Sequence, residues 1–114
     1  MEDKTYPEVI YYGRRETEGG AQPVYKQIPP DGIPVILLPD ASQKLLNHSP
    51  DGFQWGYGGS GPAQLALALL LDATSNPKTA QDYYQEFKFD KVSGWGREWA
   101  VSYTHLTLPT ILLV

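Results

Sequence analysis

The chain has 114 residues, enough for one domain built around a single core. It contains no cysteine, which excludes disulfides, thiolate chemistry and a Cys-rich zinc site, and which favours a reducing cytoplasm. Its formal net charge of −4 argues against a general nucleic-acid binder, because such a protein needs a basic face for phosphates. The longest apolar run, residues 65–71, is far too short to span a bilayer. We therefore expect a cytoplasmic protein that is neither secreted nor embedded in a membrane.

A β-hairpin is expected near the N-terminus. Residues 6–15 are rich in β-branched and aromatic side chains and end at the polar, Gly-rich segment ETEGG. Residues 23–28 alternate in character and supply the second strand. A further apolar run, residues 33–38, could be a strand or an extended packing segment, and Pro34 favours a position at the edge of the sheet. Residues 41–46 could form a short helical turn.

Two longer helices follow. The first is expected to begin at Pro62, with Ser60 or Gly61 as its N-cap and Pro62 at the first helical position. Residues 65–71 leave this helix no polar face, so it should lie in the core. The second helix begins at SNP, residues 75–77, and is amphipathic, and residues 98–100 open a last strand. The pattern predicts one α+β domain over residues 1–99, with a small, mostly antiparallel sheet packed on two helices.

The C-terminal run VSYTHLTLPT, residues 101–110, resembles the translation of a transposase sequencing adapter. The adapter codons GTC TCT TAT ACA CAT CTG ACG CTG CCG ACG encode these residues in order. We therefore interpret residues 100–114 as a tail of non-native origin and give His105 no functional weight. The tail is β-prone, however, and could still pair with the edge of a sheet.

The clearest candidate site is the Gly-rich turn, residues 55–61, which leads directly into the apolar helix. The first N–H groups of a helix lack backbone partners and lie at the positive end of the helix dipole, so they can receive a phosphate or a carboxylate. Glycines let the backbone approach such a ligand closely. The candidate ligand contacts in this segment are Trp55, Tyr57, Gly58, Gly59, Ser60, Gly61 and Gln64. The alternative is a tight corner whose glycines only let helix and sheet pack closely.

Four further residues could complete such a site. Arg14 or Arg15, at the end of the first strand, could neutralise a phosphate, and Asn47 or His48 could contact an edge of the ligand. Each also has an ordinary explanation, either solvation or structural hydrogen bonding. The chain has no Walker lysine, no strand and acidic-residue context for a dinucleotide-binding fingerprint, no legible nucleophile–base–acid set and no recognisable pattern of metal ligands. The sequence therefore favours binding over catalysis, with no cofactor and no metal.

Residues 47–72, NHSPDGFQWGYGGSGPAQLALALLLD, resemble the signature of an uncharacterised family of small phage and bacterial proteins, a domain of unknown function. YYGRR, residues 11–15, and YYQEFKFDKV, residues 83–92, extend the resemblance. It assigns no reaction, but many small phage proteins bind host defence components or their nucleotide signals. Our leading hypothesis is a phage-type sponge that sequesters a phosphate-bearing nucleotide immune signal, such as a cyclic oligonucleotide or an ADP-ribose derivative. Because tight sequestration needs nearly complete enclosure, which a small domain achieves most readily at a symmetric subunit interface, we expect a homo-oligomer. The alternatives are an interaction module that inhibits a host protein and a small nucleotide hydrolase or transferase.

Overall fold

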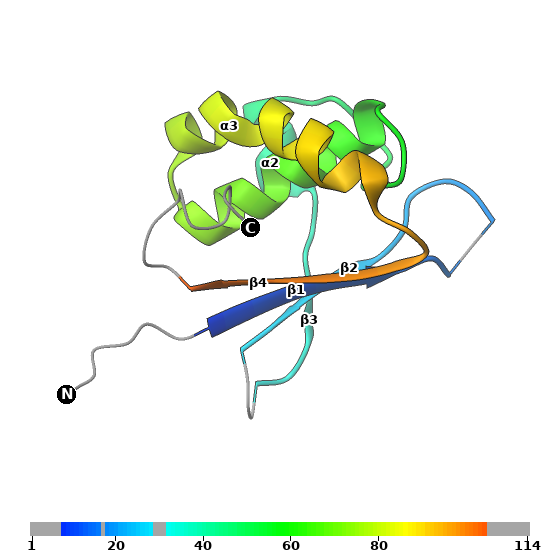
Figure 1. Ribbon diagram of the computed structural model, residues 1–114. Coiled ribbons are helices and arrows are strands. Elements are labelled where there is room, and N and C mark those ends of the chain that lie inside the picture. Colours follow the sequence, from blue (N-terminus) through cyan, green and yellow to red (C-terminus); the bar gives the residue numbers. More distant parts are fainter. Residues whose placement is uncertain (1–7, 17, 29–31, 105–114) are drawn as a thin grey trace.

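The protein has two layers, a four-stranded sheet and a group of helices on one face of it (Figure 1). The computed structural model describes residues 8–16, 18–28 and 32–104, so His105 lies outside the described residues. The strands are β1 (Glu8–Arg14), β2 (Val24–Gln27), β3 (Val35–Ile36) and β4 (Glu98–Thr104), in the order β3-β2-β1-β4. Every neighbouring pair is antiparallel. The predicted α+β fold with an antiparallel sheet is therefore confirmed.

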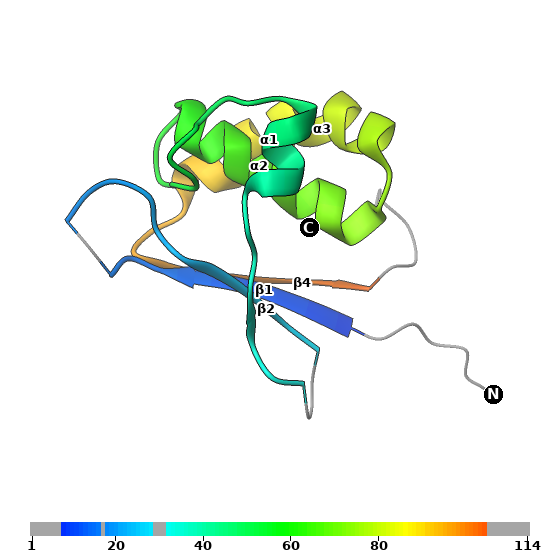
Figure 2. The same cartoon turned by 180° about the vertical axis from the view of Figure 1, so that it is seen from behind.

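The helices α1 (Asp40–Leu45), α2 (Ser60–Thr74) and α3 (Pro77–Asp90) all lie on the same side of the sheet, as the front and back views agree (Figures 1 and 2). A 3-10 turn, η1 (Val92–Gly94), leads from α3 to β4. As its apolar sequence predicts, α2 is the centre of the core, and residues 61–70 are all buried. None of the helices in the described part of the chain has the length and apolar character needed to cross a bilayer.

The two long helices begin differently from one another. In α3 the Asn76 side chain accepts a hydrogen bond from the Thr79 backbone N–H at 3.1 Å, and Pro77 occupies the first helical position, as predicted. In α2 the N-cap is Gly59, so Pro62 is the third helical residue and not the first. The third residue of a helix has no intrahelical partner for its N–H, and proline is therefore tolerated there as well.

The apolar run 33–38 forms only the two-residue strand β3, which lies at the edge of the sheet as Pro34 suggests. At the opposite edge, β4 continues through the adapter-like residues to Thr104 and pairs with β1 from Arg14↔Glu98 to Glu8↔Thr104. The expectation that the β-prone tail pairs with a sheet edge is confirmed. A ladder is made by backbone groups, so it forms with any sequence that tolerates extended geometry.

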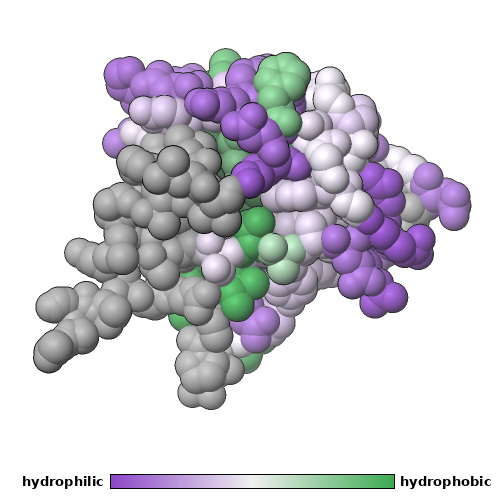
Figure 3. Space-filling model, in the orientation of Figure 1, coloured by the Kyte–Doolittle hydropathy of each residue, from purple (hydrophilic) through white to green (hydrophobic). Residues whose placement is uncertain are grey.

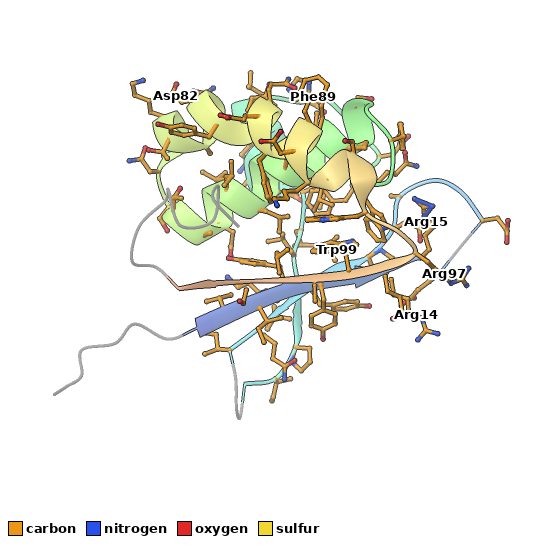
Figure 4. The ribbon with its side chains drawn as sticks, in the orientation of Figure 1. Arg14, Arg15, Asp82, Phe89, Arg97 and Trp99 are labelled. Atoms are coloured by element: carbon orange, nitrogen blue, oxygen red, sulfur yellow. The ribbon has the colours of Figure 1, made fainter. Side chains whose placement is uncertain are left out.

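Aromatic side chains fill the space between the layers at the end of the sheet where β4 begins. Trp99 projects from β4 toward the helices (Figure 4) and stacks on Trp95, with ring centroids 4.2 Å apart. The Trp55 ring lies edge-on to Trp99 at 5.5 Å. Gly13 lies beneath both indoles, and a Cβ there would be 2.7 Å from Trp99 Nε1 and 2.9 Å from the Trp55 ring. The absence of a side chain at residue 13 therefore permits this packing.

We expect Gly13→Ala to destabilise the protein by about 1–3 kcal/mol, because two packed indoles must move to admit the methyl group. Urea unfolding followed by tryptophan fluorescence measures the effect. Gly58→Ala is the matched control, since a Cβ at Gly58 meets nothing within 4 Å. Equal unfolding midpoints for the two variants would contradict the packing argument.

Candidate functional site

The Gly-rich turn is anchored to the segment that joins α3 to β4. Trp55 donates its indole N–H to the Gly96 carbonyl at 2.7 Å, and the Gly56 N–H donates to the Val92 carbonyl at 3.1 Å. Gly56 has a φ of 89°, and a Cβ on it would approach the Trp95 carbonyl to 3.0 Å. Glycine is thus required at residue 56 by conformation and by space.

The first turn of α2 has backbone N–H groups for which the described residues supply no hydrogen-bond partner. Its N-cap, Gly59, makes no side-chain capping hydrogen bond, and Pro62 carries no N–H. Within the described residues, no hydrogen bond is made by the N–H groups of Ser60 and Gly61. Gly59 has a φ of −121°, so a side chain there is not opposed by a left-handed backbone. The amides that could receive an anion are therefore those of Ser60 and Gly61.

Two adjoining hollows lie at the Gly-rich turn, and the first of them borders these amides. The first, of about 220 Å³, is lined by Ser60, Gly61, Tyr57, Gln54 and the turns around residues 20–21 and 48–52. The second, of about 140 Å³, shares Gly20, Gln54 and Tyr57 with the first and adds Arg15 and Glu18. Gln54 joins the walls because its side-chain N–H donates to the Gly20 carbonyl at 2.7 Å. The sequence did not single out Gln54 or Gly20 as candidate site residues.

Arg15 contacts the Gly-rich turn, whereas Arg14 does not. The Arg15 Nη2 atom donates to the Trp55 carbonyl at 2.5 Å, and the guanidinium lies 5.7 Å from the centre of the Trp55 ring. Arg14 is the neighbouring residue on β1, so its side chain projects from the other face of the sheet (Figure 4). There its Nε lies 3.7 Å from a Glu98 carboxylate oxygen. The two arginines proposed from the sequence thus have different surroundings.

Gln64 is fully buried, and its side-chain amide makes four hydrogen bonds to residues 42–49. Its side-chain carbonyl accepts from the backbone N–H groups of His48 and Ser49, at 2.7 and 2.9 Å. Its side-chain amide donates to the Ser42 hydroxyl at 2.9 Å and to the Leu46 carbonyl at 3.1 Å. A glutamine amide has two N–H donors and two lone pairs, so no capacity is left for a ligand. Gln64 instead fixes the 46–49 segment against the start of α2.

The Asn47 and His48 side chains lie on the segment that Gln64 holds. Asn47 is exposed, whereas His48 is half-buried and lines the first hollow. The His48 Nε2 atom is 2.7 Å from the Tyr84 hydroxyl of α3, and the two rings lie 5.4 Å apart. His48 is therefore already hydrogen-bonded within the chain.

Only one of the two aromatic candidates is open to a ligand. Trp55 is fully buried, so its ring faces are occupied by the core. Tyr57 is 47% exposed, borders both hollows and donates its hydroxyl hydrogen to the Gln54 side-chain carbonyl. Of these two side chains, Tyr57 is therefore the one that could stack on a base or a similar flat group.

Residues 11–107 match the model of DUF6166, a family of unknown function. The chain belongs to this family. The match includes every candidate site residue and continues past Trp99, and no curated protein and no solved structure matches the chain. In the described part of the chain, no three His, Asp or Glu side chains form a group that could hold a metal ion.

We expect Gln64→Leu to lower the free energy of unfolding by about 3 kcal/mol or more, because it leaves two buried N–H groups and a carbonyl without their partner. Gln85→Leu, on the exposed side of α3, is the control and should change stability by less than about 0.5 kcal/mol. Chemical unfolding followed by circular dichroism gives both values. A Gln64→Leu protein as stable as the control would mean that water replaces the amide.

Proposed function

We propose that this protein binds and sequesters a small phosphate-bearing nucleotide in the two hollows beside the start of α2. The observation that carries the proposal is the position of Arg15. Its guanidinium lies on the Gly-rich turn and borders the second hollow, while the free amides of Ser60 and Gly61 border the first. Tyr57 lies between them as a shared wall.

In this arrangement the Ser60 and Gly61 amides hold a phosphate, as helix starts commonly do. Tyr57 supplies a ring face for the base, and Arg15 faces a second anionic group or a base edge. Each hollow alone is smaller than the roughly 300–1,000 Å³ typical of a pocket for a drug-sized ligand. A nucleotide therefore spans both hollows, and a second subunit is the simplest means of enclosing it.

The charges around the hollows limit which anions can bind. The carboxylates of Asp51 and Glu18 border the first and second hollow, respectively, and the whole chain carries a net charge of −4. A long polyanion would meet repulsion over most of this surface, whereas a small ligand with one or two phosphates needs only the directed N–H donors. The proposal is accordingly for a small nucleotide and not for DNA or RNA.

The surroundings of His48 favour binding of a ligand over its chemical conversion. His48, the one histidine in the described residues, is bound to Tyr84 and has no carboxylate partner among the described hydrogen bonds and ion pairs. A hydrolase would need a poised base and an oriented nucleophile. In biological terms, the proposal is that a phage-encoded protein sequesters a nucleotide that serves as an immune signal in the host. Intact ligand recovered by mass spectrometry after heat denaturation supports it, whereas a converted product would favour an enzyme.

We expect Ser60→Glu to abolish nucleotide binding while raising the stability of the protein. A carboxylate in the first turn of α2 occupies the position of the ligand's charge, and it also stabilises the helix dipole by about 0.3–1 kcal/mol. Isothermal titration with ADP-ribose and with a cyclic dinucleotide, beside thermal unfolding, measures both effects.

Thr79→Glu is the matched control, because residue 79 is at the third position of α3 and a glutamate there stabilises a helix start in the same way. It should raise stability and leave binding unchanged. If Ser60→Glu binds as tightly as the native chain, the start of α2 is not the anion site.

We expect Asp51→Asn and Glu18→Gln each to tighten binding of an anionic ligand by about two- to fivefold, because each removes a like charge bordering a hollow. The gain should shrink as the salt concentration rises. Weaker binding in both variants would indicate that the carboxylates contact a cationic or hydrogen-bond-donating group, and the ligand class would then be wrong.

A further inference from the structure

The segment around β3 exposes an unusual amount of apolar surface. The exposed fractions are 81% for Ile33, 55% for Val35, 49% for Ile36 and 60% for Leu38, and nearby Ile28 is 46% exposed. Residues 32–38 include no charged side chain. The space-filling view of one face shows hydrophobic side chains in green both on the helical layer and at the level of the sheet (Figure 3). Contiguous apolar patches of several hundred Å² on a folded chain mark interaction sites.

The two residues of β3 are both apolar and project toward opposite faces of the sheet. Val35 is opposite Lys26, whose side chain reaches the Asp72 carboxylate of α2, so Val35 projects toward the helical face of the sheet. Ile36 is opposite Tyr25 and projects toward the uncovered face. A strand that is apolar on both faces is typical of a sheet covered on both faces, yet Val35 and Ile36 are both exposed at the edge of this sheet.

The backbone of β3 also offers free hydrogen-bonding groups. The Leu37 N–H donates to the Val24 carbonyl at 2.7 Å, and the antiparallel register pairs Val35 with Lys26. Because backbone groups alternate in direction along a strand, the polar groups of residues 35 and 37 point toward β2. The N–H and carbonyl of Ile36 therefore point away from the sheet, toward its free edge.

We propose that this edge is a homodimer interface, in which β3 of a second copy pairs antiparallel with β3 about a twofold axis at Ile36. The two Ile36 residues then exchange both of their backbone hydrogen bonds. In the same register the Leu38 N–H of each copy faces the Pro34 carbonyl of the other, so the missing N–H of Pro34 removes only one bond on each side.

Charge and area both favour a second copy of this chain as the occupant. Two acidic chains of net charge −4 repel each other over most approaches, and the uncharged segment 32–38 brings no like charges together. The exposed side chains add several hundred Å² of apolar surface to the paired backbone on each copy, approaching the roughly 800 Å² per partner of a stable interface. The twofold axis closes the assembly, whereas pairing of β3 with a β4 edge would continue into a filament.

The test is the mass of the native chain and its variants in solution, measured by light scattering after gel filtration. The native chain should be a dimer, and Ile36→Pro should be a monomer with an unchanged circular dichroism spectrum. Proline at residue 36 removes only the outward N–H, a position at which edge strands tolerate it. Ile33→Glu is the second variant, because it sets two carboxylates on the shared patch without touching the hairpin hydrogen bonds.

Phe89→Lys is the control, since this 66% exposed side chain lies on α3, away from the sheet (Figure 4). It should remain dimeric. A native chain that is monomeric at high micromolar concentration overturns the proposal and leaves the edge to a different protein. A dimer that survives both Ile36→Pro and Ile33→Glu also overturns it. The proposal does not depend on nucleotide binding, since mass is measured without ligand.

Discussion

The buried amide of Gln64 is the interaction on which the geometry of the candidate site depends. It is the single polar side chain in the buried run 61–70 of α2, and four hydrogen bonds to residues 42–49 satisfy it. These bonds fix the segment before the Gly-rich turn to the first turns of α2. The anchors of Trp55 and Gly56 fix the other side. The wall that residues 48 and 49 contribute to the first hollow is therefore held in place by a buried side chain.

Local patterns predicted most of the fold, because each of its elements has a local signal. The Gly-rich connection between residues 15 and 23, the apolar run 65–71 and the Asn76-Pro77 helix start all correspond to observed features. The roles of Arg14 and Arg15 could not be predicted, because adjacent strand residues face opposite sides and the sequence does not show which side the helices cover. For Gln64 a signal existed, since one polar residue in an apolar helix implies a buried, hydrogen-bonded group.

The long pairing of β4 with β1 shows how weakly a sheet edge depends on side chains. Residues 101–104 resemble translated adapter, yet their backbone continues the register that begins at Glu98. Val101, two residues after Trp99, also packs against the core on the helical face of the sheet. Aromatic packing by Trp99 sets the register, and the following residues need only accept extended geometry. The two edges of the sheet thus differ, since β4 is extended along all of β1 whereas β3 pairs over two residues.

The glycines of the Gly-rich turn differ in whether the fold itself requires a glycine. Gly56 requires its left-handed backbone, and side chains at Gly59 and Gly61 would approach Tyr57 and Gln54. At Gly58 the φ is not in the left-handed region, and a Cβ would meet nothing within 4 Å. The contacts of the described residues therefore give no reason for glycine at residue 58. It lies beside Tyr57 and two residues before Ser60, where the proposed ligand would approach the backbone. Absence of a side chain at residue 58 is what such an approach requires.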